Sequence, residues 1–219
     1  MMTLRLTLPA ALLLLLFLPN CVSTNYYTGR TLKKGEKVIA SGVDNLIWLS
    51  QDRDILDKEF PFSISLGAVY GLPARFEAGF RSYFPYVYEI HVRHQVDPAM
   101  IRWFDMSLNV HSGFFIPGGS DDGVLPYHRL GMTLSREIQS LQPYIGYYHV
   151  FNHPDEVHDM AFYRMLCFGV GIPRGHDLIL PEWNYCFDPH EGGGFMTFGI
   201  GIRAVLPRRG DGVSEDKTP

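Results

Sequence analysis

The residues with the greatest potential for chemistry lie between positions 105 and 111. Ser107, Asn109 and His111 alternate along one predicted strand, and Asp105 shares their face. A nucleophilic serine needs a base within hydrogen-bond reach and an acid that orients this base. Same-face residues two positions apart are about 7 Å apart on a strand, so a neighbouring strand would have to complete the set. Because an ordinary hydrogen-bond network gives the same pattern, we assign no catalytic residue and expect no enzyme.

The remaining histidines and the cysteines form no pattern typical of a metal site. The histidines fall mainly around predicted loops, and the three cysteines contain neither a CxxC pair nor a histidine at ligand spacing. We therefore expect no metal and no cofactor. Cys167 and Cys186 flank a short turn in two successive strand candidates. The spacing leaves open whether they form a cross-strand disulfide or never meet.

The elements that position these residues are strands. Apolar and polar residues alternate with a period of two, and no helical stripe of period 3.6 competes over any long window. Turns rich in glycine, proline, aspartate and asparagine separate the segments. The pattern predicts an all-β chain of about ten strands, within a range of eight to twelve. The predicted segments are residues 37–49, 62–70, 74–84, 86–96, 104–114, 127–136, 143–151, 159–172, 177–187 and 195–206.

Charged side chains of both signs lie on the polar face of these strands. In a membrane barrel they would face the lumen, where they can pair, whereas an outward arginine at mid-depth would cost about 2–4 kcal/mol. On a soluble barrel the same residues would form the solvated face. We expect these residues to face the lumen: Arg75, Glu77, Arg81, Glu89, Arg93, Asp105, His111, Arg129, Glu182 and Arg203.

The lengths of the connections favour the membrane barrel. The first, fifth, seventh and ninth connections are long and acidic or rich in glycine, whereas the second, sixth and eighth are mostly short. Long loops at one end and short turns at the other, with both termini at the short-turn end, are typical of outer-membrane barrels. The third connection, around residues 82–85, is an exception. Aromatic residues near strand ends agree with interfacial girdles: Tyr70, Phe84, Tyr86, Tyr88, Trp103, Phe104, Phe114, Tyr144, Trp183 and Phe187.

The N-terminal sequence predicts export. Arg5 precedes a leucine-rich run that is too short for a membrane helix, so residues 1–20 are interpreted as a signal peptide. Cys21 follows immediately, at the position where a bacterial lipobox places its acylated cysteine, although Asn20 replaces the usual small residue. The sequence leaves open whether Cys21 is lipidated or is a chance cysteine in an ordinary signal peptide. A lipid there would tether the chain to the leaflet that faces the periplasm. We expect residues 21–36 to form a linker, residues 37–206 the barrel, and residues 207–219 a disordered polar tail.

Composition excludes some partners. Only 19% of the residues are charged and 46% are hydrophobic, which agrees with an apolar environment. The net charge of −4 gives no basic footprint for nucleic acid. No ligand can be named from the sequence.

From about residue 36 to residue 206 the chain resembles the small outer-membrane β-barrel proteins of Gram-negative-type bacteria. The last strand resembles the assembly signal of this class through Thr197, Gly199, Ile202 and Ala204, although it lacks a terminal aromatic residue. The resemblance implies a single antiparallel up-and-down transmembrane barrel in the bacterial outer membrane. It also implies two partners, membrane lipid and the outer-membrane insertion machinery.

Three functions remain open for a chain with this strand pattern. The first is an outer-membrane scaffold or narrow pore without catalytic chemistry. The second is a periplasmic or secreted ligand-binding barrel of lipocalin type, with its apolar face inside. The third is a lipid-modifying outer-membrane enzyme.

Overall fold

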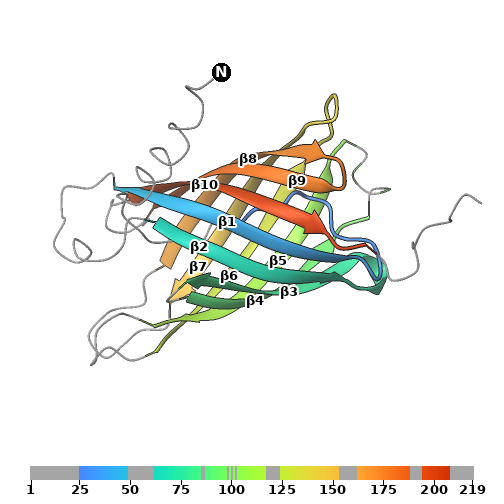
Figure 1. Ribbon diagram of the computed structural model, residues 1–219. Coiled ribbons are helices and arrows are strands. Elements are labelled where there is room, and N and C mark those ends of the chain that lie inside the picture. Colours follow the sequence, from blue (N-terminus) through green and yellow to red (C-terminus); the bar gives the residue numbers. More distant parts are fainter. Residues whose placement is uncertain are drawn as a thin grey trace, which may run out of the picture.

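The computed structural model describes residues 25–48, 62–84, 87–97, 99, 101, 103–116, 124–152, 162–187 and 194–207. The signal peptide, Cys21 and residues 208–219 lie outside this part of the chain. Ten antiparallel strands form a closed barrel (Figure 1). They are β1 (Lys37–Trp48), β2 (Phe62–Gly71), β3 (Phe76–Phe84), β4 (Val87–Gln95), β5 (Asp105–Phe115), β6 (Leu125–Ser135), β7 (Gln142–Asn152), β8 (Phe162–Arg174), β9 (Asp177–Phe187) and β10 (Gly194–Val205).

The topology is up-and-down. Each strand pairs with the next along the chain, and β1 closes the barrel by pairing with β10, with Val38 opposite Val205 and Trp48 opposite Phe195. The predicted fold is confirmed, including the number of strands. The largest shift of a described strand start is two residues, at β3 and β6; residues 159–161, expected in the eighth strand, lie outside the described residues.

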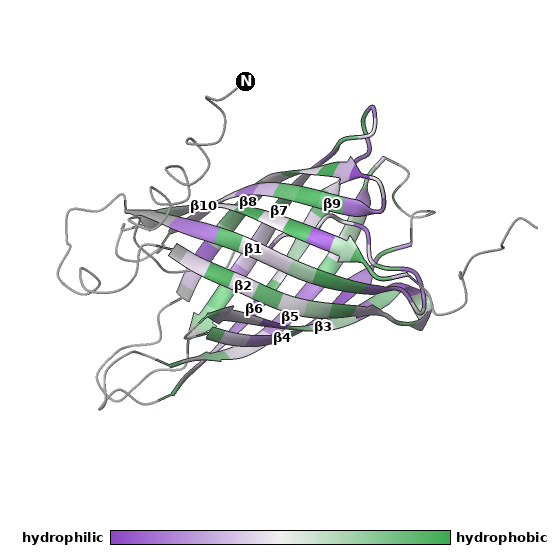
Figure 2. Ribbon diagram, in the orientation of Figure 1, coloured by the Kyte–Doolittle hydropathy of each residue, from purple (hydrophilic) through white to green (hydrophobic). Residues whose placement is uncertain are grey.

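The two faces of the strands differ sharply in polarity. Large apolar side chains point outward and are exposed, as at Leu66, Ile90 and Ile200. The residues between them point inward and are buried, and many are charged. Figure 2 shows the resulting alternation of hydrophobic and hydrophilic residues along each strand. Because an exposed apolar face is stable only against lipid, this barrel has the polarity of a membrane barrel, opposite to that of a lipocalin.

In the described part of the chain, no helix is long and apolar enough to cross a membrane.

The connections define two ends of the barrel. At the short-turn end, β1 begins, β10 ends, and residues 175–176 join β8 to β9. At the long-loop end, residues 49–61, 116–124, 153–161 and 188–193 connect strands. Two connections depart from this asymmetry: residues 85–86 form a short connection at the long-loop end, and residues 96–104 form a longer one at the short-turn end.

Part of the expected linker, residues 21–36, lies inside the barrel; its residues 21–24 lie outside the described part of the chain. Residues 25–29 are buried inside the barrel, and the chain then reaches the short-turn end before it enters β1 (Figure 1). We call residues 25–32 the luminal segment. Its lack of periodicity gave no sign of burial, because its partners come from the inner faces of many strands rather than from one neighbouring strand.

The interfacial position expected for Tyr144 is also wrong. It was grouped with the interfacial aromatic residues, but its side chain is buried in the lumen and its hydroxyl donates to Glu182 at 2.8 Å. Tyr70, Phe84, Trp103 and Phe114 are exposed. The pattern of β7 places Tyr144 on the inner face, which its position near a strand end does not reveal.

Candidate functional site

The lumen is organised around Tyr27. The centroid of its ring lies 4.4 Å from Cζ of Arg93, 4.6 Å from Cζ of Arg81 and 5.3 Å from Cζ of Arg203. These distances are typical of cation–π contacts, which gain strength when the cation is desolvated. The hydroxyl of Tyr27 forms a hydrogen bond with Nε2 of His91 at 3.0 Å. One aromatic side chain of the luminal segment therefore separates and stabilises three buried guanidinium groups.

The buried charges are balanced. Among the described residues, four carboxylates are buried, Asp44, Glu77, Glu89 and Glu182, and so are four guanidinium groups, Arg81, Arg93, Arg129 and Arg203. Arg93 pairs with Glu77 at 2.6 Å, Arg203 lies 3.6 Å from the same carboxylate, and Arg129 pairs with Glu89. Because an unpaired buried charge is costly, this pairing is a condition for folding of the barrel.

The same charges hold the backbone of the luminal segment. The amides of Asn25 and Tyr26 donate to the carboxylate of Glu182, the latter at 2.6 Å. Both terminal nitrogens of Arg81 donate to the carbonyl of Asn25 at 3.1 Å. Further along, the amide of Leu32 donates to Glu77 at 2.8 Å. Buried peptide groups outside a sheet need such partners, and here side chains supply them.

Tyr26 lies over the seam between the first and last strands. Its hydroxyl contacts the carboxylate of Asp44 and lies 3.1 Å from the carbonyl oxygen of Val43. Its ring occupies the space above Gly201, where a Cβ atom would overlap ring carbons, and its hydroxyl lies above Gly199 in the same way. Glycine is therefore required at these two positions of β10 by the close approach of the luminal segment.

The luminal segment leaves the barrel through a polar rim at the short-turn end. Arg30 pairs with Asp105 at 2.6 Å and with Glu137 at 2.8 Å. Burial lowers the pKa of Arg30, but the hydrogen bonds with the two carboxylates outweigh burial and raise the pKa overall. The amide of Thr31 donates to Gln95 at 3.2 Å. These contacts anchor the segment where it turns towards β1.

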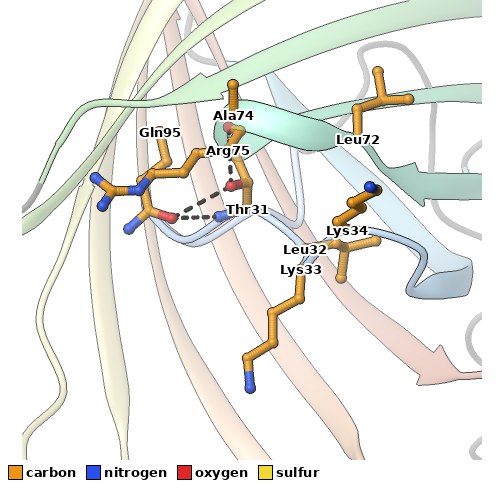
Figure 3. A pocket seen from close by; sticks show the side chains of 8 residues that line it. All are labelled: Thr31, Leu32, Lys33, Lys34, Leu72, Ala74, Arg75 and Gln95. Carbon is orange, nitrogen blue, oxygen red and sulfur yellow. Dashed lines mark hydrogen bonds between the residues drawn. The ribbon is translucent and has the colours of Figure 1, made fainter.

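A pocket opens beside this rim (Figure 3). Figure 3 shows the hydroxyl of Thr31 between Gln95 and the carbonyl of Arg75, to which it donates at 3.1 Å. The lining mixes basic and apolar groups and includes no catalytic combination of side chains. It consists of Thr31, Leu32, Lys33, Lys34, Leu72, Ala74, Arg75 and Gln95.

Arg75 was expected in the lumen, and this expectation is wrong. It lies in the short 3-10 turn η1 (Pro73–Arg75), and its exposed side chain pairs with Asp97 at 2.8 Å. Ala74 and Arg75 have positive φ angles of 54° and 61°. This left-handed turn interrupts the alternation, so that β3 begins only at Phe76. The hydrogen bond from the amide of Ala99, with the contact from Arg75, lowers the pKa of Asp97.

The other residues expected in the lumen lie on the inner face. Asp105 is at the rim, with its side chain 16% exposed, and the rest are buried. Sequence reasoning missed the luminal segment and Asp44; the only signal was a pair of adjacent tyrosines in an otherwise polar stretch. The buried members of the expected set are Glu77, Arg81, Glu89, Arg93, His111, Arg129, Glu182 and Arg203.

The candidate catalytic residues do not form one constellation. The hydroxyl of Ser107 donates to Asn109 at 3.0 Å and accepts from Arg93 at 2.9 Å. His111 instead uses Nδ1 to contact Glu89 at 2.9 Å. Asp105 is engaged by Arg30. Ser107 therefore has no hydrogen-bonded base, which nucleophilic activation requires.

Three inner residues approach the geometry of a metal site. Ligand atoms of Glu89, His91 and His111 lie within 4.8 Å of one another. However, the carboxylate of Glu89 already accepts from Arg129 and His91 contacts Tyr27. The nearby guanidinium groups oppose a further cation. The three side chains are better described as part of the charge network.

The two described cysteines are free thiols buried in the lumen. Their strands are adjacent, but Cys167 lies opposite Asn184, and Cys186 lies opposite Met165. The two thiols are thus diagonal rather than directly opposite. The structure shows no disulfide between them.

No protein-family model matches the sequence, and no curated protein matches it. Among solved structures, Neisserial surface protein A (NspA) is 9% identical, with 77% of this chain and 96% of that chain covered and a TM-score of 0.38. Ail of Yersinia pestis is 13% identical, with 79% and 99% covered and a TM-score of 0.32. The transport unit of the autotransporter AIDA-I from Escherichia coli is 9% identical, with 80% and 91% covered and a TM-score of 0.45. These likenesses concern the fold alone.

The membrane location of the protein follows from the polarity of its own surface. A closed barrel leaves no unpaired strand edge, and its exposed apolar face requires lipid. Antiparallel barrels with charged interiors and this asymmetry of loops are the architecture of bacterial outer membranes. The protein is a small outer-membrane β-barrel.

Proposed function

We propose that this protein is a structural barrel whose lumen is closed by its own N-terminal segment. The burial of Asn25, Tyr26, Tyr27 and Thr28, each at most 2% exposed, carries this proposal. Their contacts reach β1, β3, β4 and β9, so the segment bridges the lumen rather than lining one wall. A barrel of about ten strands has little interior space, and this segment fills it.

The ion pairs around the segment support a static interior. Arg93 alone contacts Glu77, Asn109, Ser107 and the carbonyl of Thr28. Removing the segment would take hydrogen-bond partners from Arg81, Arg93 and Glu182, and each lost hydrogen bond to a charged group costs about 1.5–3 kcal/mol. The closed state is thus the stable one, and a narrow pore would require all these contacts to be exchanged for water.

A barrel without catalytic chemistry is part of the same proposal. Ser107 lacks a hydrogen-bonded base, and its hydroxyl is buried beneath the luminal segment. The partners that we propose are membrane lipid, for the apolar outer face, and the outer-membrane insertion machinery, for β10. Phospholipid hydrolysis by the purified barrel that disappears in Ser107→Ala would overturn the non-catalytic part.

Conductance across planar lipid bilayers tests the closed lumen. The wild-type barrel should give no stable channel, whereas Tyr26→Ala combined with Tyr27→Ala should give conductance steps because the buried rings are removed. Arg30→Ala is the matched control, since it changes the rim and leaves both rings in place; it should stay closed. Heat-modifiable gel migration verifies folding of each variant. Stable conductance by the folded wild type would overturn the proposal, even if the double variant does not fold.

A further inference from the structure

Three side chains that can bind an anion lie on the outer face of the barrel near its long-loop end. Arg164 of β8 and His128 of β6 are exposed, and His149 of β7 is partly exposed. Tyr148 and Met165, which are adjacent to two of them in sequence, are buried in the lumen, so the alternation of the strands directs all three outward. The barrel wall separates them from the charge network inside.

The three residues are neighbours across strands. His149 lies directly opposite Arg164, and His128, which lies opposite Phe151, is diagonal to His149. Directly opposite Cβ atoms are about 4.5–5.5 Å apart, and diagonal neighbours are about 7–8 Å apart. His128, His149 and Arg164 therefore share one area of the outer face, which we call the outer patch.

The outer patch lies at the level of the lipid headgroups. Arg164 is opposite Phe187, the last residue of β9, and His128 is opposite Phe151, one residue before β7 ends. On the lipid face of a membrane barrel, arginine is costly at mid-depth and tolerated near the interface, where aromatic residues also concentrate. Because the long loops of outer-membrane barrels are extracellular, the outer patch faces the headgroups of the outer leaflet.

The surroundings of the outer patch suit an anionic group. The two residues opposite Arg164 are His149 and Phe187, neither of which carries a carboxylate. The ring of His149 lies between those of Tyr147 and Phe151, at centroid distances of 5.1 Å and 6.3 Å. A guanidinium group can donate two parallel hydrogen bonds to a phosphate, and an imidazole can donate a further one from its N–H.

Apolar side chains continue from the outer patch towards the middle of the membrane. On the same face, Tyr147 is opposite Leu166, and Ile145 is opposite Phe168. Ile145 and Phe168 are exposed. We call these four residues the apolar strip. A ligand that fits both the outer patch and the apolar strip has a phosphate group and acyl chains.

We propose that the outer patch binds the phosphate group of an outer-leaflet lipid whose acyl chains lie along the apolar strip. Arg164 holds two phosphate oxygens, and His128 and His149 donate to the same group. This inference rests on the proposed contact between the outer face and membrane lipid, and it is independent of the closed lumen. It distinguishes one specifically bound lipid from the general contact of the outer face with the bilayer.

Native mass spectrometry of the full barrel, released from detergent micelles, tests this site. The probe is lipid A with both of its phosphates, and the reference lipid is the same lipid A after removal of both phosphates. The variant His128→Gln, His149→Gln, Arg164→Gln should bind the phosphorylated probe about tenfold more weakly than wild type or worse, as expected for the loss of at least one hydrogen bond to a charged group. Both proteins should bind the reference lipid equally. Heat-modifiable migration verifies folding.

Lys37→Gln is the matched control, because it removes an exposed cation of β1 at the short-turn end; it should bind the probe like wild type. Equal binding of the probe by wild type and the triple variant would overturn the proposal. If the triple variant does not fold, Arg164→Gln alone decides, and binding equal to that of Lys37→Gln overturns the proposal.

Two further measurements separate the source of the phosphate from the lipid contact itself. Excess inorganic phosphate should not displace the probe from wild type, because it lacks acyl chains; complete displacement would show that the outer patch binds phosphate alone and would overturn the lipid site. Insertion of the barrel into phosphatidylcholine vesicles is measured separately. Failure to insert would contradict the proposed contact with membrane lipid, whereas insertion with equal probe binding by wild type and variant overturns the outer patch only.

Discussion

The ring of Tyr27 lies 4.4 Å from the guanidinium carbon of Arg93, although the two residues come from segments with no backbone pairing between them. Arg93 in turn donates to the carbonyl of Thr28, next to Tyr27. The N-terminal segment and the barrel wall thus depend on each other: the segment separates buried cations, and the cations satisfy its backbone.

Substitutions of Tyr27 separate the contribution of its ring from that of its hydroxyl. Tyr27→Phe keeps the ring beside the three guanidinium groups and should cost about 1 kcal/mol, because only the hydrogen bond to His91 is removed. Tyr27→Leu should cost more, since each cation–π interaction of the ring contributes about 0.5–2 kcal/mol. Urea unfolding in lipid vesicles, followed by tryptophan fluorescence, measures both. Equal stability of the two variants would show that the ring contributes nothing beyond its volume.

Neutralising the carboxylate of Glu77 should strongly lower the stability of the barrel. Its carboxylate pairs with Arg93 and lies near Arg203, and it accepts from the amide of Leu32. Glu77→Gln leaves buried cations without their counter-charge, so we expect a loss of about 3–5 kcal/mol in the free energy of unfolding. Asp97→Asn removes an exposed partner of Arg75 and is the matched control, with no measurable loss expected. A loss at Asp97 equal to that at Glu77 would contradict the burial argument.

Substitutions at two neighbouring residues of β10 should destabilise the barrel for different reasons, one on its outer face and one in its lumen. Ile202 is exposed on the outer face, so Ile202→Arg should cost about 2–4 kcal/mol against lipid or block insertion. Gly201 faces the Tyr26 ring, so Gly201→Ala should cost about 1–3 kcal/mol through overpacking. Adding Tyr26→Ala should relieve the second defect and leave the first unchanged. Measured folding yields into vesicles that show no such selective relief would argue against contact between Tyr26 and Gly201.

The thiols of Cys167 and Cys186 should be unreactive in the folded barrel. Both are buried and free, and burial disfavours the reactive thiolate. We expect no maleimide labelling of these two residues in lipid and full labelling after heating in detergent, read by mass spectrometry. A disulfide-linked peptide containing both residues in the native, unreduced protein would be evidence against this arrangement of β8 and β9.

The amino-acid sequence by itself determined the ten strands and their two faces. A period of two in side-chain direction is a local property of extended backbone, so alternation around Ile90 or Ile200 predicts which side chains point outward. The connection lengths, and the cost of placing charges such as Arg129 in hydrocarbon, indicated that the apolar face contacts lipid. These inferences need no knowledge of which strands are partners.

Only the tertiary structure decided how the lumen is filled. The luminal segment has no repeating pattern, because its backbone is satisfied by single side chains such as Arg81 and Glu182, which come from strands far apart in the sequence. The outward position of Arg75 depended on two left-handed residues in a turn. Local periodicity predicts neither feature. The contacts of the luminal segment form only when the barrel closes and brings distant strands together.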